Sequence, residues 1–314
     1  MTKLPLTLLT VACSFALTAC YSSGGSGGSV QPPKVTDKAP DVATPPAASN
    51  NTSSNSGSQN GNSKFFTTVN SAFETKPSTE ISGTILTVAQ NGDLTAKKPE
   101  TFEDLDSIMV DGVKITLFTA GDKLSNVAVG KLKQSTENGG KLYVGSMADS
   151  YGTYGSYQDP NSFKAMRYGA YTLNGQTHLF VQGFLTPTQS TINVLGDTFY
   201  PMPKESTYKY SGFALYGKDN QYAQLNSEVI ADFSNKKLKV ELKEAGAATA
   251  KATFGGDITG NTFSGTRDGI ETKGAFYGSL ARDVAGLFND TKTGNNGVFG
   301  ASDKRAISSS LEAF

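Results

Sequence analysis

Apolar and polar residues alternate between tight turns along the last third of the chain, and this pattern restricts the fold more than any other feature. Strict alternation places successive side chains on opposite faces of a strand. Counting from Ser206 gives eight strands, at about residues 206–217, 227–234, 237–243, 247–259, 261–267, 272–279, 283–289 and 296–302. Because most connections are short, we expect an antiparallel up-and-down barrel that closes at eight strands.

The segment 228–242 indicates which face of this barrel meets water. It folds back at Asn235-Lys236, so that one face carries apolar side chains and the other carries lysine and glutamate. The predicted apolar pairs are Val229 with Leu242, Ala231 with Val240, and Phe233 with Leu238. A charged outer face predicts a soluble barrel, since a barrel in lipid turns its apolar side chains outward.

Upstream of the barrel, apolar residues return with period two from about Phe65. Hairpin turns are predicted at Asp111-Gly112 and Asn174-Gly175, and a weaker one at Asn91-Gly92. The second turn sets Tyr171 opposite His178. No segment carries a sustained helical stripe of apolar residues, so we expect an all-β chain with few helices.

The composition excludes several functional classes. The chain has 28 Lys+Arg and 28 Asp+Glu, so it lacks the basic excess of a nucleic-acid-binding protein. One His and two Cys leave too few ligands for a structural zinc site, and we expect no metal centre. A Ser-His-Asp triad would have to use His178, which lies within a predicted strand. We therefore expect no enzymatic activity.

The N-terminus predicts the compartment. Residues 1–19 read as a signal peptide, with Lys3 before a short, largely apolar stretch. Leu17-Thr18-Ala19-Cys20 resembles the bacterial lipobox, in which the signal is cut before a Cys that is then acylated. Residue 21 is Tyr rather than Asp, which favours the outer membrane over retention in the inner membrane. Cys13 would be removed and Cys20 lipidated, so the mature chain would form no disulfide.

Residues 20–63 follow as a tether. Ser, Gly, Asn and Pro make up 26 of positions 21–63, and this stretch has no Leu, Ile, Phe or Met. Such a segment buries too little apolar surface to offset the entropy of ordering. We expect five parts in all: the signal at 1–19, the tether at 20–63, a β-rich domain at 64–204, the barrel at 205–305 and a tail at 306–314.

Several motifs in the predicted strands resemble a known superfamily. Gly274-Ala-Phe-Tyr-Gly278, Ala285-Gly-Leu-Phe288 and Gly297-Val-Phe-Gly-Ala-Ser-Asp-Lys-Arg305 resemble the closing strands of transferrin-binding protein B barrels. Upstream, Arg167-Tyr-Gly169, Leu179-Phe-Val-Gln-Gly183 and Met202-Pro203 look like the hemophilin type of Slam-dependent surface lipoprotein. The resemblance covers about residues 80–305.

The resemblance implies a β-rich N-terminal handle domain that binds the ligand and a C-terminal barrel that supports it. It also implies export by the Slam translocon and cooperation with a TonB-dependent receptor in the outer membrane. The ligand would be haem, a haemoprotein or an iron carrier such as transferrin. A complement regulator bound for immune evasion, or a role as an adhesin, is the alternative.

Seven residues of the handle are candidate ligand contacts. Tyrosine side chains offer apolar area and a hydroxyl at low entropic cost, as in antibody loops. His178, the single His, is the candidate haem ligand, although a sheet histidine hydrogen-bonded to its neighbours is the commoner arrangement. A haem site would need a second group, such as Tyr or Met166, or an open position. The candidates are Tyr151, Tyr154, Tyr157, Met166, Tyr168, Tyr171 and His178.

Overall fold

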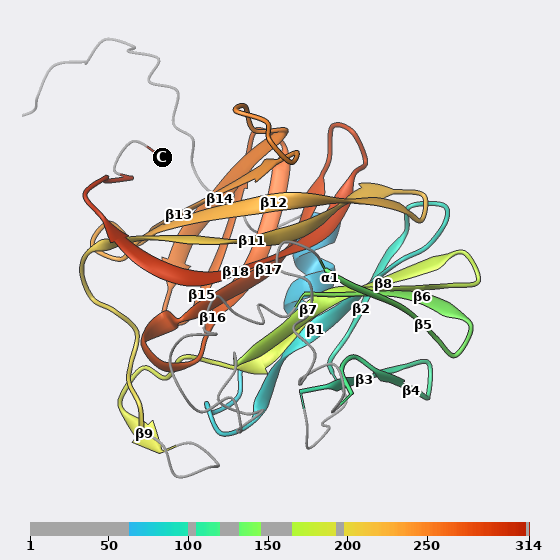
Figure 1. The fold of residues 1–314 in the computed structure, drawn as a ribbon, viewed down its shortest axis with the longest axis horizontal. Coiled ribbons are helices and arrows are strands. Elements are labelled where there is room, and N and C mark those ends of the chain that lie inside the picture. The colour runs from blue at the N-terminus through green and yellow to red at the C-terminus, as the bar shows by residue number, and fades with distance from the viewer. Residues whose placement is uncertain (1–62, 100–104, 120–131, 146–164, 193–197, 312–313) are drawn as a thin grey trace, which may run out of the picture. The chain divides into compact units, whose positions relative to one another are not determined.

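A computed structural model of the protein describes residues 63–99, 105–119, 132–145, 165–192, 198–311 and 314, all within one compact unit that spans residues 55–314. The C-terminal part is a closed barrel in which each strand pairs with the next and the last pairs with the first. This confirms the predicted eight-stranded antiparallel barrel (Figure 1). Its strands are β11 Thr207–Lys218, β12 Gln221–Asp232, β13 Lys237–Lys243, β14 Ala252–Thr259, β15 Thr262–Arg267, β16 Ile270–Tyr277, β17 Asp283–Asp290 and β18 Asn296–Ile307.

Phenylalanine rings fill the barrel interior. Phe254, Phe263, Phe276, Phe288 and Phe299 are each at most 1% exposed and lie 5.0–6.1 Å from one another in successive ring pairs. Closely packed aromatic pairs of this kind stabilise a core beyond the area that they bury. The barrel interior is therefore a packed core.

The outer wall of the barrel is of two kinds. On β13, Lys239 and Lys243 pair with Glu241 at 2.8 Å, so this side carries the predicted charged face. On β16 to β18, the residues between the inward rings are also apolar and buried, as at Ala285, Leu287 and Val298. Strands that are buried on both faces read as continuous apolar runs rather than as alternating ones. This side of the wall packs against the N-terminal domain.

The connection between β12 and β13 differs from the sequence prediction. Asp232 pairs with Lys237 and Ala231 with Leu238, so four residues rather than two lie in the loop, and Val229 opposes Val240 instead of Leu242. The carboxylate of Asp232 accepts hydrogen bonds from the backbone N–H of Asn235 at 3.0 Å and from its side chain at 2.9 Å. These bonds close the wider loop, and a register shift of two residues keeps every side chain on its predicted face.

The N-terminal domain is built on a six-stranded antiparallel sheet, here called the handle sheet, in the order β2-β1-β8-β7-β6-β5. Its central hairpin has the predicted register, with Tyr171 opposite His178. At Asn91-Gly92 the connection is a five-residue loop over 89–93 instead of a two-residue turn. The strands are β1 Ile81–Val88, β2 Leu94–Lys97, β5 Lys133–Glu137, β6 Gly140–Gly145, β7 Met166–Leu173 and β8 Gln176–Phe184.

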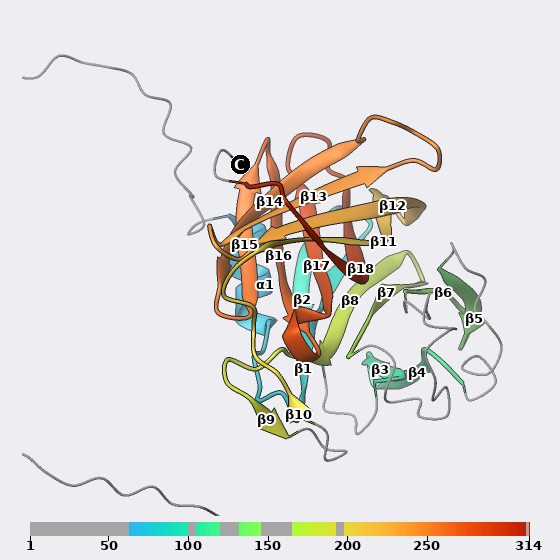
Figure 2. The same ribbon diagram turned by 60° about the vertical axis from the view of Figure 1, so that its left-hand side comes forward.

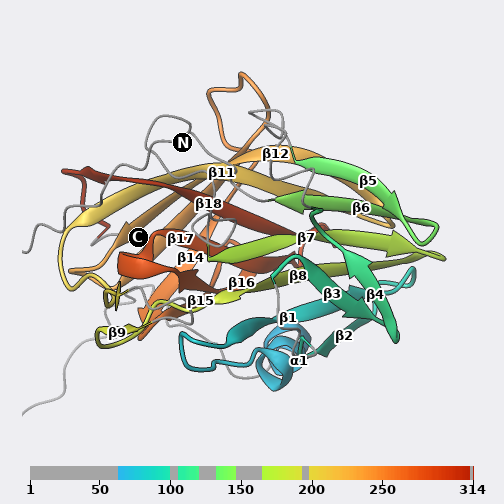
Figure 3. The ribbon, with the colours of Figure 1, turned by 60° about the horizontal axis from the view of Figure 1, so that its bottom comes forward.

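A short helix, α1 (Lys64–Ala72), precedes the handle sheet, where the sequence predicted strand-like alternation (Figure 3). The hydroxyl of Ser63 accepts a hydrogen bond from the backbone N–H of Phe66 at 3.1 Å and so caps the N-terminus of the helix. Phe65, Phe66, Val69 and Ala72 are buried, and their spacing suits one face of a helix. The prediction failed because nine residues rich in Phe, Thr and Val offer only two turns of periodicity and favour strands by intrinsic propensity.

Two small hairpins complete the described chain. The hairpin of β3 (Ser107–Val110) and β4 (Val113–Thr116) has the register predicted around Asp111-Gly112. It covers one face of the handle sheet, and the barrel covers the other (Figure 2). The second hairpin joins β9 (Thr191–Ile192) and β10 (Thr198–Phe199), and the single-turn 3₁₀ helix η1 (Ser279–Ala281) follows β16. Within the described ranges no helix has the length and apolarity needed to cross a membrane.

The handle sheet and the barrel dock through two reciprocal tyrosine–glycine contacts. Tyr168 of β7 lies over Gly300 of β18, where a Cβ on the glycine would come within 2.2 Å of the ring. Tyr277 of β16 lies in the same way over Gly183 of β8, with a corresponding distance of 2.5 Å. Both tyrosines are 0% exposed. Because each contact tolerates only glycine, the pair sets how closely the two layers approach.

Candidate functional site

A pocket of about 140 Å³ lies on the handle, between the β3–β4 hairpin and the turn that joins β7 to β8. The turn at Asp111-Gly112 forms one side, and the ends of β7 and β8 form the other. Val113 is 47% exposed at its edge, whereas His178 is 4% exposed. The pocket lining includes Asp111, Val113, Asn138, Tyr171, Gln176 and His178.

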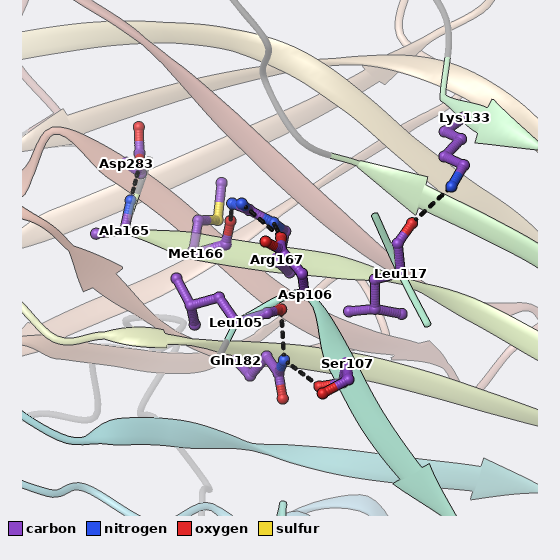
Figure 4. Close-up of polar contacts among 10 residues, drawn as sticks. All are labelled: Leu105, Asp106, Ser107, Leu117, Lys133, Ala165, Met166, Arg167, Gln182 and Asp283. Carbon is purple, nitrogen blue, oxygen red and sulfur yellow. Dashed lines mark hydrogen bonds and ion pairs between the residues drawn. The ribbon is translucent and has the colours of Figure 1, made fainter. Parts of the chain in front are cut away.

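Buried polar contacts fasten the β3–β4 hairpin to the handle sheet (Figure 4). The guanidinium of Arg167 on β7 contacts one carboxylate oxygen of Asp106 through Nε and through its second terminal nitrogen, both at 2.8 Å. The amide nitrogen of Gln182 donates to the carbonyls of Leu105 and Ser107, both at 2.9 Å. Asp106 directly precedes β3, so this clamp determines where the hairpin lies over the sheet.

The base of the hairpin has a further restraint beside the clamp. Lys133 of β5 donates from Nζ to the carbonyl of Leu117 at 2.9 Å. The guanidinium of Arg167 and the ammonium of Lys133 lie 5.3 and 5.2 Å from the ring centre of Phe118, within the range of a cation–π contact. The pocket is therefore preformed rather than assembled by a ligand.

His178 lies on the inner wall of the pocket and is held by its neighbours. Its Nδ1 is 2.9 Å from the hydroxyl of Thr87 on β1. Its ring stacks near that of Tyr171, with 6.3 Å between the ring centres. Burial lowers the pKa of His178, and the negative charge of Asp111 opposes this shift without cancelling it. At neutral pH the imidazole is uncharged.

Tyr171 and Asp111 are fixed in a similar way. The hydroxyl of Tyr171 donates to the carbonyl of Glu137 at 2.9 Å, and burial raises the pKa of this phenol. Asp111 accepts a hydrogen bond from Lys97 of β2 at 2.8 Å, which lowers the pKa of its carboxyl group. The pocket therefore has a neutral, aromatic interior and one ion pair at its edge.

The structure brings two of the seven candidate residues together, Tyr171 and His178. Met166 and Tyr168 lie on the opposite face of β7, where they are 1% and 0% exposed in the core between handle sheet and barrel. Tyr151, Tyr154 and Tyr157 lie outside the described residues, as does Cys20.

The described surroundings of His178 do not fit haem. Sites for ligands of that class usually enclose about 300–1,000 Å³, several times the volume of this pocket. The imidazole is almost fully buried, and one of its two nitrogens already contacts Thr87. Across the described segments, no group of three or more His, Cys, Asp or Glu side chains is placed to hold a metal ion.

The sequence prediction missed the residues that form the clamp. Arg167 stands between Met166 and Tyr168 in a buried strand, and a charged residue in such a run normally needs a partner. That signal points to a buried ion pair but not to Asp106, which lies 61 positions away along the chain.

Replacing His178 by glutamine is expected to flatten the fall in stability that the wild type shows as the pH drops through the unfolded-state pKa of about 6.5. The folded-state pKa lies below the unfolded value of about 6.5, so the unfolded chain takes up the proton first as the pH falls. Wild-type stability therefore declines as the pH drops through 6.5. Glutamine can keep the contact with Thr87 but does not titrate.

Thermal unfolding of both proteins at several pH values measures this difference. His178 is the single His of the chain, so no other imidazole contributes. Equal slopes for the wild type and His178→Gln would show that the imidazole is not buried in its neutral form.

Matches to known proteins cover both the barrel and the full chain. A family described as the C-lobe and N-lobe beta barrels of Tf-binding protein B matches residues 202–303, which hold most of the barrel. An uncharacterized protein of Haemophilus influenzae is 31% identical over 316 residues, covering 96% of this chain and 98% of that protein. A crystal structure of a transferrin-binding protein B variant from Haemophilus parasuis is 20% identical, with a TM-score of 0.50.

The match to the Haemophilus parasuis structure covers 72% of this chain but 45% of that chain, so this protein spans less than half the length of the solved relative. At 20% identity the likeness shows the fold alone. The Haemophilus influenzae relative matches in sequence over nearly the whole of both proteins. The chain therefore belongs to one family with the Haemophilus influenzae protein, and its C-terminal domain is a barrel of the transferrin-binding protein B type.

Proposed function

We propose that this protein is a non-enzymatic bacterial surface lipoprotein that binds a host iron-carrying protein of the transferrin type. The observation that carries this proposal is the packing of a β-rich handle against a barrel of the transferrin-binding protein B type. The protein from Haemophilus parasuis that shares this fold is named for binding transferrin. Iron taken from the host protein would then pass to a TonB-dependent receptor in the outer membrane.

In this proposal the handle pocket receives a side chain of the host protein. Protein interfaces concentrate binding energy where an anchor residue fills a preformed, largely apolar pocket. The exposed side chain of Val113 and the hairpin turns at the edge of the pocket supply such a surface. Tyr151, Tyr154 and Tyr157, the tyrosines predicted from the sequence as ligand contacts, would also bind the host protein.

Direct haem binding through His178 has less support than protein binding, because the described pocket is too small for haem. A haemoprotein remains compatible with the same docking surface, since a protein ligand needs no cavity for the haem itself. A complement regulator would also dock in this way.

A panel of immobilised ligands tests the proposal: iron-loaded transferrin, haemoglobin, haem and a complement regulator. We expect the purified full chain to bind iron-loaded transferrin saturably and to leave the haem absorption spectrum unchanged. Binding of the complement regulator alone would replace the proposal by a role in immune evasion. A Soret shift that His178→Ala abolishes would replace it by direct haem binding.

The membrane anchor is a separate part of the proposal and has its own test. Acylation at Cys20 would attach the chain to the outer membrane, and residues 21–63 would hold the folded body away from it. Cys20→Ser is expected to block cleavage before residue 20 and to remove the protein from the outer-membrane fraction. Unchanged processing and partition would contradict the anchor.

Transport to the cell surface would use the Slam translocon. Deletion of this translocon is expected to abolish labelling of intact cells by an antibody against the barrel, while the total amount of protein in the outer membrane stays the same. Surface labelling that survives the deletion would contradict this step.

A further inference from the structure

A second pocket, of about 460 Å³, lies at the end of the barrel where the chain enters β11. Met202, Pro203 and Lys204 line it from the entering segment. Phe233 and Lys236 line it from the β12–β13 loop, and Ile258 lines it from β14. In Figure 1 this entering segment leads from the hairpin labelled at β9 to the start of β11, and in the sequence it follows β10.

Backbone hydrogen bonds fix the walls of this barrel-end pocket. The N–H of Met202 donates to the carbonyl of Pro187 at 3.1 Å, and that of Ile258 donates to Lys236 at 2.8 Å. The N–H of Phe233 donates to Ser206 at 3.1 Å. The pocket therefore exists before any ligand binds, which limits the entropy lost on binding.

The barrel-end pocket is lined mainly by apolar groups, together with Thr259 and Gly260. Phe233 and Ile258, which line it, are 4% and 6% exposed, and Met202 and Pro203 are half-buried. Tyr200, two residues before Met202, is 53% exposed and extends the apolar surface along the entering segment. The volume falls within the usual range of small-molecule sites, about 300–1,000 Å³.

The rim of the barrel-end pocket is cationic. Lys204 and Lys236 are exposed, and neither forms an ion pair or a side-chain hydrogen bond with any residue that the structure describes. The neighbouring Lys237 pairs with Asp257 at 2.7 Å, so that pair adds no net charge. The carboxylate of Asp232 is buried and occupied by the N–H groups of Asn235 and Leu311.

We propose that the barrel-end pocket binds an amphipathic anion, an acyl chain that ends in a carboxylate or a phosphate. The chain would cover Phe233 and Ile258, and the anionic head would lie between Lys204 and Lys236. The two ammonium groups would repel a cationic head and would add little attraction for a neutral one. This site serves a different ligand from the handle pocket and does not depend on the proposed host protein.

Isothermal titration with dodecanoate, kept below its critical micelle concentration, tests the site in the full chain. Saturable binding at one site is expected. The double variant Lys204→Glu/Lys236→Glu should weaken it about tenfold, since each rim charge changes from attractive to repulsive. Dodecyltrimethylammonium, which has the same tail and the opposite charge, should not bind.

The matched control is Lys218→Glu/Lys292→Glu, which changes the net charge equally at the other end of β11 and in the β17–β18 loop. It should bind dodecanoate as the wild type does, and both double variants should keep the wild-type thermal midpoint. The proposal would be overturned if dodecanoate showed no saturable binding or if dodecyltrimethylammonium bound as tightly. It would also be overturned if both double variants lost the same affinity for dodecanoate.

A parallel measurement identifies the source of the acyl anion. Co-sedimentation with vesicles of phosphatidylglycerol, lost in Lys204→Glu/Lys236→Glu alone, would show that the pocket engages a membrane lipid. Dodecanoate binding without co-sedimentation would show that it takes up a free fatty acid.

Discussion

Truncating Tyr168 to alanine is expected to lower the free energy of unfolding by about 3–5 kcal/mol. The ring is 0% exposed between the handle sheet and the barrel. Its removal leaves a cavity between two layers that other contacts hold apart, so the neighbouring residues cannot collapse into the space. Urea denaturation followed by far-UV circular dichroism measures the change.

A double-mutant cycle shows whether Tyr168 acts through Gly300. Gly300→Ala alone is expected to cost about 1–3 kcal/mol, because its Cβ would lie 2.2 Å from the tyrosine ring. In Tyr168→Ala/Gly300→Ala the added methyl group enters the vacated space. The double variant should therefore lose less free energy of unfolding than the two single variants lose together. Strict additivity would mean that these two residues do not contact each other.

Replacing Arg167 by methionine is expected to cost about 3–5 kcal/mol and to release the β3–β4 hairpin from the handle sheet. Arg167 is 4% exposed, and its loss leaves the carboxylate of Asp106 poorly solvated beside apolar residues. Methionine keeps much of the apolar length of the side chain, so the charge and its hydrogen bonds are the main loss.

Hydrogen exchange distinguishes this local opening from general destabilisation. Amide protection should fall over residues 105–118 in Arg167→Met and should change far less in β12 to β14. Arg167→Lys keeps the charge but loses the planar arrangement of donors of the guanidinium. Amide protection over residues 105–118 should therefore lie between that of the wild type and that of Arg167→Met. A uniform loss of protection across the chain would contradict the assigned role of the clamp.

The barrel could be predicted from the sequence because its determinants are local. In the barrel, alternation indicated which residues of strands such as β13 face the core. In the N-terminal domain, the two-residue turns at Asp111-Gly112 and Asn174-Gly175 gave the register of their hairpins in the same local way. The β12–β13 register was wrong because it depends on the side chain of Asp232, which closes a wider loop. Helix α1 was missed because its two turns show their amphipathic face only once they pack on the sheet.

The candidate site could be predicted only in part. The hairpin register placed Tyr171 beside His178, and the same alternation assigns Tyr168 and Tyr171 to opposite faces of β7. The role of Asp106 and Gln182 could not be predicted, since their contacts join segments 61 to 77 positions apart. Tertiary packing alone brings these residues together, and no local pattern records it.

Surface plasmon resonance between the full chain and iron-loaded transferrin tests the proposed function most directly. The proposal predicts saturable binding that Val113→Asp, at the edge of the handle pocket, weakens about tenfold or more. Ile192→Asp, an aliphatic residue that is also exposed but lies in the β9–β10 hairpin, should leave the affinity unchanged. Absence of saturable binding would contradict the proposed function. Equal affinity of the wild type and Val113→Asp would contradict the assignment of transferrin binding to the handle pocket.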